Sequence, residues 1–299
     1  MLRFFLILTF LALIFIRPFI ASLAFAAKDM AHCGASQLLG FLSERNISYM
    51  FAEELLSRNR AFLPFILPAT LGGYLIMHLP LGIAFYRQHY KNVDIPLWKR
   101  PPQNSLLLCS IILMLSALLL TRSIGPIVSL ILSALIVLFL RKSSGQKTLK
   151  FIICFLGATL FMFILVRSYN VGYWRNPIFS LAQRQLYWAK TLAVIWAHPF
   201  LGTGPGNMPF VGSNFSHNSY LQIWAESGPL VLFGFLNIIF YVFSKNLHEE
   251  ALSHPLALWI WISVLSFLIH NLIDFTFFLP ETAVIWWGIL ALFCKKQYA

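Results

Sequence analysis

Charged residues are scarce in this chain: they make up 11% of 299 residues, whereas hydrophobic residues make up 59%. About a quarter of the residues in a soluble domain are charged, so this composition excludes an ordinary water-exposed surface. Acidic residues are fewest, and the net charge is +12. In a soluble protein, such an excess of positive charge would suggest binding to nucleic acid. Here the basic residues lie mainly in short loops between apolar runs, which favours the positive-inside pattern of a membrane protein and no nucleic-acid partner.

Cysteine is also rare, with four residues: Cys33, Cys109, Cys154 and Cys294. None forms a Cys-x-x-Cys pair, and the last three lie in apolar runs, so the sequence supports neither a disulfide framework nor a zinc site. It also lacks a P-loop, a His-Glu-x-x-His motif and a nucleophile elbow. We therefore expect no metal and no cofactor.

Long apolar runs are what the sequence does have, in keeping with its mean hydropathy of +0.76. A helix of roughly 20 residues crosses the bilayer core. The sequence predicts an all-α, polytopic transmembrane bundle with about eight spans: 3–24, 61–86, 105–121, 126–140, 150–167, 229–244, 256–272 and 279–294. The first run also fits a cleaved signal peptide, because Ala24 and Ala26 form an Ala-x-Ala-like site. We favour an uncleaved helix, and either alternative leaves residue 28 outside.

The basic segment 141–150 is the strongest marker of the inner side, and it predicts that both termini face inward. The stretch 168–228 then forms a partly helical loop on the outer, periplasmic side. Ser180 and Gln183 resemble a capping box that opens a helix, which ends before His198-Pro199. One apolar stripe is predicted on this helix, facing the membrane surface or the bundle: Leu181, Trp188, Leu192 and Ile195.

Two arginines are candidates for binding an anion. Arg122 lies at the outer end of a predicted helical hairpin, where it either extends to lipid head groups or clamps a phosphate with its planar fork of donors. Arg184 lies near the start of the outer helix. It belongs either to a solvated polar face or to a second diphosphate contact that the helix N-terminus would support.

His217 and Asp274 are the other polar candidates. His217 lies among polar residues at the membrane face, and its imidazole could accept a proton from an attacking hydroxyl, with Glu226 orienting it. The alternative is a loop histidine without a function. Asp274 follows His270 and Asn271 at the outer end of the seventh span, where the alternative is a polar cluster that satisfies backbone groups.

Four motifs occur in a fixed order. They are Arg184-Gln-Leu-Tyr-Trp, His198-Pro-Phe-Leu-Gly-Thr-Gly, Ser216-His-Asn-Ser-Tyr-Leu-Gln and Glu226-Ser-Gly-Pro. Together with Asp274 and the Thr-Arg-Ser-Ile-Gly element around Arg122, they resemble the O-antigen ligase and O-antigen polymerase family over about residues 105–294.

The resemblance implies an enzyme that moves a glycan from undecaprenyl diphosphate at the outer face of the bacterial inner membrane. A ligase delivers it to the lipid A core, a polymerase to another glycan and an O-oligosaccharyltransferase to a protein. By motif position, the implied catalytic residues are His217, Arg184 and Arg122, and the implied substrate-binding residues are Tyr187, Asn218, Tyr220, Glu226 and Asp274. A glycolipid transporter is the non-enzymatic alternative, but only Arg17 lies deep in a predicted span.

The predicted domain division follows the resemblance. Residues 1–104 form N-terminal transmembrane helices, and residues 105–299 form the ligase-like membrane domain, including the loop 168–228. Family members usually have around twelve spans, so the resemblance suggests either a shortened member or a truncated start. The expected partners are the lipid-linked glycan, a lipid A-core or glycan acceptor, and membrane lipids.

Overall fold

The computed structural model describes residues 60–62, 65, 67–90, 102–142, 146–167, 179–208, 215–246 and 255–294. These residues form helices and no strands, which confirms the all-α prediction. The helices are α5 (Pro68–Tyr90), α6 (Pro102–Leu120), α7 (Ile124–Lys142), α8 (Lys147–Arg167), α9 (Phe179–Ala197), α10 (Ser219–Asn246), α12 (Pro255–His270), the 3-10 turn η2 (Thr276–Phe278) and α13 (Pro280–Cys294). The predicted span 3–24, Arg17, Cys33 and the alternative signal peptide lie outside the described residues.

Three of these helices are long and apolar enough to cross a membrane: Pro68–Gln88, Ile124–Lys142 and Ser219–Lys245. Shorter apolar helices accompany them, at Ser105–Leu120, Leu149–Met162 and Leu256–His270. The described part of the chain is therefore a helical, membrane-type protein. Most helix bounds agree with the apolar runs to within a few residues, but α5 begins at Pro68 rather than at 61. Proline suits the first position of a helix, where its missing N–H costs nothing.

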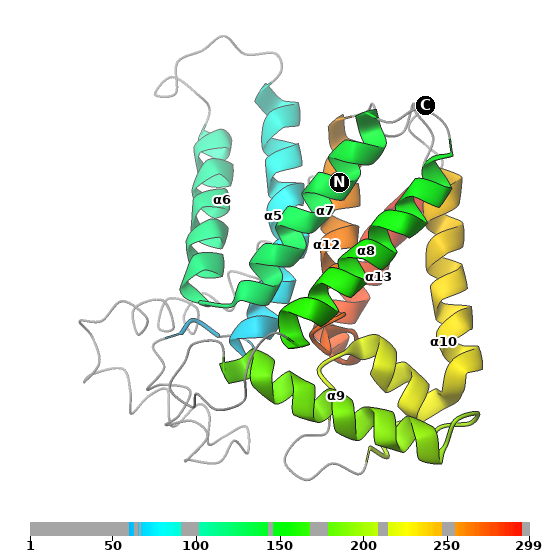
Figure 1. Cartoon of the computed structure of the whole chain (residues 1–299). Coiled ribbons are helices and arrows are strands. Elements are labelled where there is room, and N and C mark those ends of the chain that lie inside the picture. The colour runs from blue at the N-terminus through cyan, green and yellow to red at the C-terminus, as the bar shows by residue number, and fades with distance from the viewer. Residues whose placement is uncertain are drawn as a thin grey trace, which may run out of the picture.

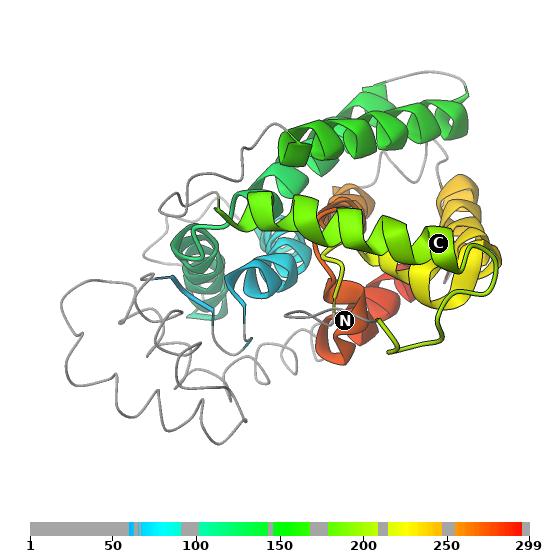
Figure 2. The same ribbon diagram turned by 60° about the horizontal axis from the view of Figure 1, so that its bottom comes forward.

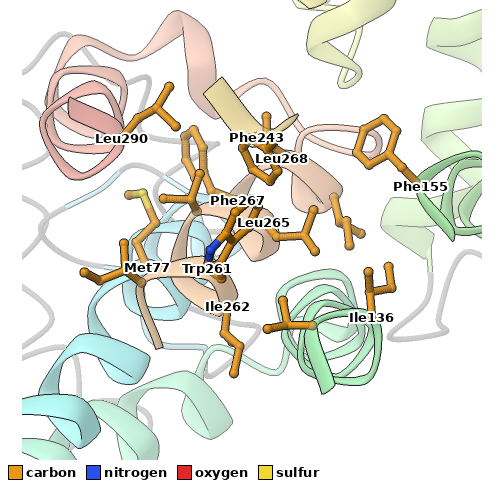
Figure 3. Close-up of a cluster of buried hydrophobic side chains, with 14 of the residues drawn as sticks. Met77, Ile136, Phe155, Phe243, Trp261, Ile262, Leu265, Phe267, Leu268 and Leu290 are labelled. Carbon is orange, nitrogen blue, oxygen red and sulfur yellow. The ribbon is translucent and has the colours of Figure 1, made fainter. Parts of the chain in front are cut away.

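Helix α12 occupies the centre of the bundle, surrounded by α5, α7, α8, α10 and α13 (Figure 1). Nearly every residue from Leu256 to His270 is buried. Figure 3 shows Trp261 and Phe267 of α12 among side chains from the neighbouring helices, including Met77, Ile136 and Phe243. A helix that is apolar all round is buried in a protein core or in a membrane span, and α12 is buried by its neighbouring helices.

Helices α5 and α12 also meet through small and polar residues. The Ser263 hydroxyl donates to the Met77 carbonyl at 2.6 Å, and the Ser266 hydroxyl donates to the Ile76 carbonyl at 3.1 Å. Such hydroxyls hold apolar helices together because they find no water in the bilayer. Helix α5, from the predicted N-terminal region, thus shares its core with α12. The domain division at residue 104 stays a prediction.

Helix α9 has a different direction from the bundle and runs across one end of it (Figures 1 and 2). The first limb of α10, Ser219 to Ser227, lies beside α9 at this end, and the chain then kinks at Gly228 before the second limb rises along the bundle. The second limb begins at Pro229, which agrees with the predicted start of this span near residue 229, and the first limb is an additional helical segment before it. The Gly228-Pro229 pair marks the boundary between the two limbs, because Gly228 has a non-helical φ of 81°.

The kink is completed by the glycine turn, residues 198–207, which follows α9. Pro229 has no N–H to bond the Ala225 carbonyl four residues earlier. The backbone N–H of Thr203 donates to that carbonyl instead, at 2.9 Å, and the N–H of Gly204 donates to the Glu226 carbonyl, also at 2.9 Å. These two backbone hydrogen bonds join the His198 and Glu226 motifs and bond the glycine turn to α10.

Replacing Gly228 by alanine should destabilise this junction. Gly228 has a φ of 81°, and an added Cβ would lie 2.0 Å from the Phe200 carbonyl oxygen. Backbone strain at such a φ alone costs about 1–3 kcal/mol. We expect a lower midpoint of thermal unfolding in detergent for Gly228→Ala. Gly234→Ala is the matched control, because it is in the same helix and no atom lies within 4 Å of an added Cβ. Equal midpoints in the two variants would contradict the described junction.

Candidate functional site

Three segments that are distant in sequence meet at one end of the bundle. They are residues 184–188 of α9, the turn 215–219, and residues 270–275 at and after the end of α12. The Arg184 guanidinium forms an ion pair with the Asp274 carboxylate, with Nη2 and Oδ2 3.2 Å apart. His270 Nε2 lies 3.7 Å from the same oxygen. The other carboxylate oxygen accepts the backbone N–H of Phe275 at 2.8 Å. Asp274 therefore links α9 to the end of α12.

Arg184 is buried, which excludes the solvated polar face considered from the sequence. The buried stripe of α9 follows helical spacing and consists of Arg184, Trp188, Thr191 and Ile195. Leu192, which we predicted in this stripe, is instead 42% exposed. The helix turns a charged residue inward because Asp274 is there to pair with it, and a buried charge requires such a partner.

The pair leaves Arg184 in an unusual electrostatic setting. Burial lowers the pKa of Arg184 from its ordinary value, and the Asp274 carboxylate counteracts that shift. Arginine nevertheless stays protonated in proteins. The site therefore contains a desolvated guanidinium whose charge acts strongly on its neighbours, because little water screens it.

His217 lies in a turn with a strained backbone, at a φ of 53°. Only two other non-glycine residues have a positive φ in the described ranges, Arg122 and Gln146. The turn is held on both sides. The Ser216 hydroxyl donates to the Asn218 carbonyl at 2.6 Å, and the Asn218 side chain accepts the N–H groups of Tyr220 and Leu221, both at 3.0 Å. Asn218 thus caps α10, and the cap fixes where His217 stands.

The imidazole of His217 lies between aromatic rings. Tyr187 of α9 stacks on it with ring centroids 5.1 Å apart, and Phe275 meets it edge to face at 4.8 Å. Trp188 donates from its indole N–H to the His217 carbonyl at 3.4 Å. Within the described residues, Nδ1 of His217 is buried without a hydrogen-bond partner. The ring orientation is therefore set by packing.

The pKa of His217 is lowered to about 4, chiefly by burial and also by the nearby Arg184 guanidinium, while the Asp274 carboxylate partly offsets both effects. The imidazole is consequently neutral at physiological pH, with a lone pair available to accept a hydrogen bond or a proton. So low a pKa makes it a weak base. A weak base can still orient a hydroxyl that attacks a substrate, and it takes the proton of that hydroxyl late in the reaction, when the hydroxyl has become more acidic.

Asn218 and Tyr220, both predicted to bind substrate, have structural partners on α12 and in the turn that follows it. The Asn218 amide donates to the Leu272 carbonyl, and the Tyr220 hydroxyl donates to the Leu268 carbonyl, both at 2.8 Å. Ser219 adds a hydrogen bond from its hydroxyl to the Asn271 side chain at 2.7 Å. These contacts dock the start of α10 onto the end of α12 and so bring His217 next to Asp274.

Glu226 lies on the far side of the α10 first limb, with the glycine turn. Its carboxylate accepts the Gly206 backbone N–H at 3.1 Å and the Gln222 amide at 2.8 Å. Gln222 in turn accepts the Ser216 backbone N–H at 3.1 Å. The contacts of Glu226 therefore reach the His217 turn through Gln222 and the backbone. The orienting role considered for Glu226 would be indirect.

Arg122 is exposed in the tight turn between α6 and α7. Its side chain forms no hydrogen bond or ion pair with the described residues, Arg184 and His217 included. The turn itself is close to the cluster, because an added Cβ on Gly125 would lie 3.7 Å from Cε1 of His270. The Arg60 guanidinium fixes the turn by donating to the Thr121 carbonyl at 2.7 Å.

Sequence reasoning gave no role to Phe275 or Arg60, and it named His270 only as a neighbour of Asp274. The spacing of His270 and Asp274, four residues apart at a helix end, was a usable signal. Arg60 and Phe275 had none, because their contacts depend on the tertiary packing.

The comparisons with known proteins bear on the whole arrangement. Residues 109–236 match the O-antigen ligase family model. The match confirms the resemblance seen in the motifs, and it includes Arg122, Arg184 and His217. No curated protein and no solved structure matches the chain. Asp274 and His270 lie beyond the part that matches the O-antigen ligase family, and only the folded geometry connects them to it.

Proposed function

We propose that this chain transfers a glycan from undecaprenyl diphosphate to the lipid A core at the periplasmic face of the bacterial inner membrane. The observation that carries the proposal is the convergence of His217 and Arg184, both inside the O-antigen ligase match, on the buried Asp274. A neutral imidazole beside a desolvated guanidinium suits the attack of a hydroxyl on a carbon that carries an anionic leaving group.

In the proposed reaction, the acceptor hydroxyl attacks the anomeric carbon of the glycan. The new carbon–oxygen bond forms as the bond between that carbon and the diphosphate oxygen breaks, and undecaprenyl diphosphate leaves. His217 orients the hydroxyl and takes its proton. The exposed Arg122 meets the diphosphate directly, and Arg184 stabilises the negative charge that develops on it.

The placement of this site requires a specific topology, which is part of the proposal. About eight spans with both termini inside would put the loop 168–228 in the periplasm, where lipid-linked glycans are presented. The distribution of basic residues supports this orientation. The crosswise direction of α9 also supports it, since a helix that does not cross the bilayer suits a site at the membrane surface.

Deleting the gene in its host tests the proposal and separates the related activities. If the chain is a ligase, long glycan accumulates on the lipid carrier and is absent from lipid A. Single glycan units on lipid A would indicate a polymerase instead, and loss of glycan from proteins alone would indicate an O-oligosaccharyltransferase. Both results would overturn the lipid A-core acceptor. Unchanged glycans in the deletion strain would contradict glycan transfer altogether.

A further inference from the structure

The glycine turn presents large apolar side chains at its outer edge. Four residues are more than three-quarters exposed: Trp196 (81%), Phe200 (78%), Leu201 (85%) and Leu230 (81%). We call these four residues the apolar rim. Exposed apolar side chains that occur singly are ordinary, but a contiguous group indicates a contact surface. The proposed function gives the rim no role.

The rim is contiguous because its two chain segments are joined backbone to backbone. An added Cβ on Gly228 would lie 2.0 Å from the Phe200 carbonyl oxygen and 3.4 Å from Cα of Leu201. Leu230 follows only two residues later. Trp224, on the first limb of α10, donates from its indole N–H to the Pro199 carbonyl at 3.3 Å. These contacts fix the outward direction of the rim.

The rim continues an exposed apolar surface on the second limb of α10. Helix α10 is one of the helices apolar enough to cross a membrane, and its second limb exposes further apolar side chains: Val231 (52%), Phe233 (67%), Ile238 (54%) and Tyr241 (58%). Leu230 is the first of this series, so the rim extends it toward α9. If the second limb of α10 crosses the bilayer, lipid covers its exposed side chains. The rim adjoins those side chains, so lipid is also the expected occupant of the rim.

The length of the second limb places the rim at one membrane interface. From Pro229 to Asn246 the limb is roughly 27 Å long at about 1.5 Å per residue, close to the hydrocarbon thickness of about 30 Å. At the far end, the Lys245 ammonium lies 5.0 Å from the ring centroid of Tyr241. Lysine and tyrosine are typical of an interface. Leu230 and the rim then lie at the opposite interface, where tryptophan is also typical.

We propose that the apolar rim inserts into the bilayer surface at the end of the bundle where α9 lies, and anchors the C-terminal end of α9 there. The anchor would hold α9 along the membrane surface and set the height of Arg184 and His217 above the lipid. Apolar side chains on a crosswise helix bind membranes in this way, with their apolar face at the boundary between head groups and acyl chains.

Spin-label depth measurements test the anchor without depending on activity. Single cysteines are placed in a cysteine-free background at Phe200→Cys and Leu201→Cys, labelled with a nitroxide, and reconstituted into phosphatidylethanolamine–phosphatidylglycerol vesicles. Collision with oxygen, which partitions into lipid, is compared with collision with a water-soluble nickel chelate. Phe233→Cys is the lipid-facing control, and Asn207→Cys, in the same turn, is the control in water.

The anchor predicts that labels at 200 and 201 collide preferentially with oxygen, as the label at 233 does, whereas the label at 207 collides preferentially with the nickel chelate. Labels at 200 and 201 that match the label at 207 would overturn the proposal. Protection from both reagents would overturn it too, because it would indicate a protein partner on the rim. Thermal midpoints equal to that of the cysteine-free parent show that each labelled variant is folded.

Discussion

Arg184→Leu is expected to reduce glycan transfer by about 100- to 1,000-fold, the usual effect of removing a group that stabilises charge in the transition state. The same change should destabilise the protein, since it leaves the Asp274 carboxylate buried without its ion-pair partner. Breaking one side of a buried pair typically costs about 3–5 kcal/mol. Surface glycan attached to lipid A in a complemented deletion strain measures the transfer, and thermal unfolding in detergent measures the stability.

A double variant separates the structural effect from the functional one. Arg184→Leu combined with Asp274→Asn removes both charges, while the asparagine oxygen still accepts the Phe275 N–H. We expect most of the thermal stability to return and the transfer to stay absent. Lys190→Ala, on the exposed face of the same helix, is the matched control with normal transfer. Wild-type transfer in the double variant, at matched expression, would refute the role of Arg184.

His217→Asn is expected to reduce transfer by about 100-fold, the low end of the range for loss of a general base, because its low pKa makes His217 a weak base. Asparagine is the informative replacement because it tolerates the positive φ of this turn better than other residues do. The thermal midpoint should therefore stay near that of the wild type. The rate of transfer by purified protein in vesicles, measured under single-turnover conditions, gives the effect.

His198→Asn is the matched control for the histidine, since His198 is exposed at the start of the glycine turn. It should transfer glycan at the normal rate. A low pKa for His217 makes its proton transfer a smaller part of catalysis than the charge stabilisation by the arginines. If His217→Asn retains full activity while it is folded, the histidine is a structural residue of the α10 cap and not part of the chemistry.

The helices themselves were largely predictable, because apolar runs of membrane length leave few alternatives in the bilayer. The first limb of α10 was not predicted. Proline after glycine normally marks a helix boundary, and the second limb does begin at Pro229, but a further helical limb from Ser219 precedes it and is bonded to the glycine turn. The sequence does not reveal that this turn supplies the N–H groups that complete the kink.

The candidate site was predictable as a set of residues and not as a set of contacts. The motifs indicated Arg184 and His217, but the burial of Arg184 depends on Asp274, 90 residues away in the chain. Glu226 looked like a partner of His217 because it is near in sequence. Its carboxylate lies with the glycine turn instead, because the first limb of α10 points it there. One sequence carries no direct signal for such long-range pairs.

The most direct test of the account is transfer by the purified protein. Wild type and His217→Asn are each reconstituted with the lipid-linked glycan and the lipid A-core acceptor extracted from the deletion strain, and the products are separated by gel electrophoresis and mass spectrometry. We predict that the wild type joins the glycan to the acceptor and releases undecaprenyl diphosphate, and that the folded variant leaves the donor intact. Equal product from both proteins, or no consumption of donor by the wild type, would contradict the account.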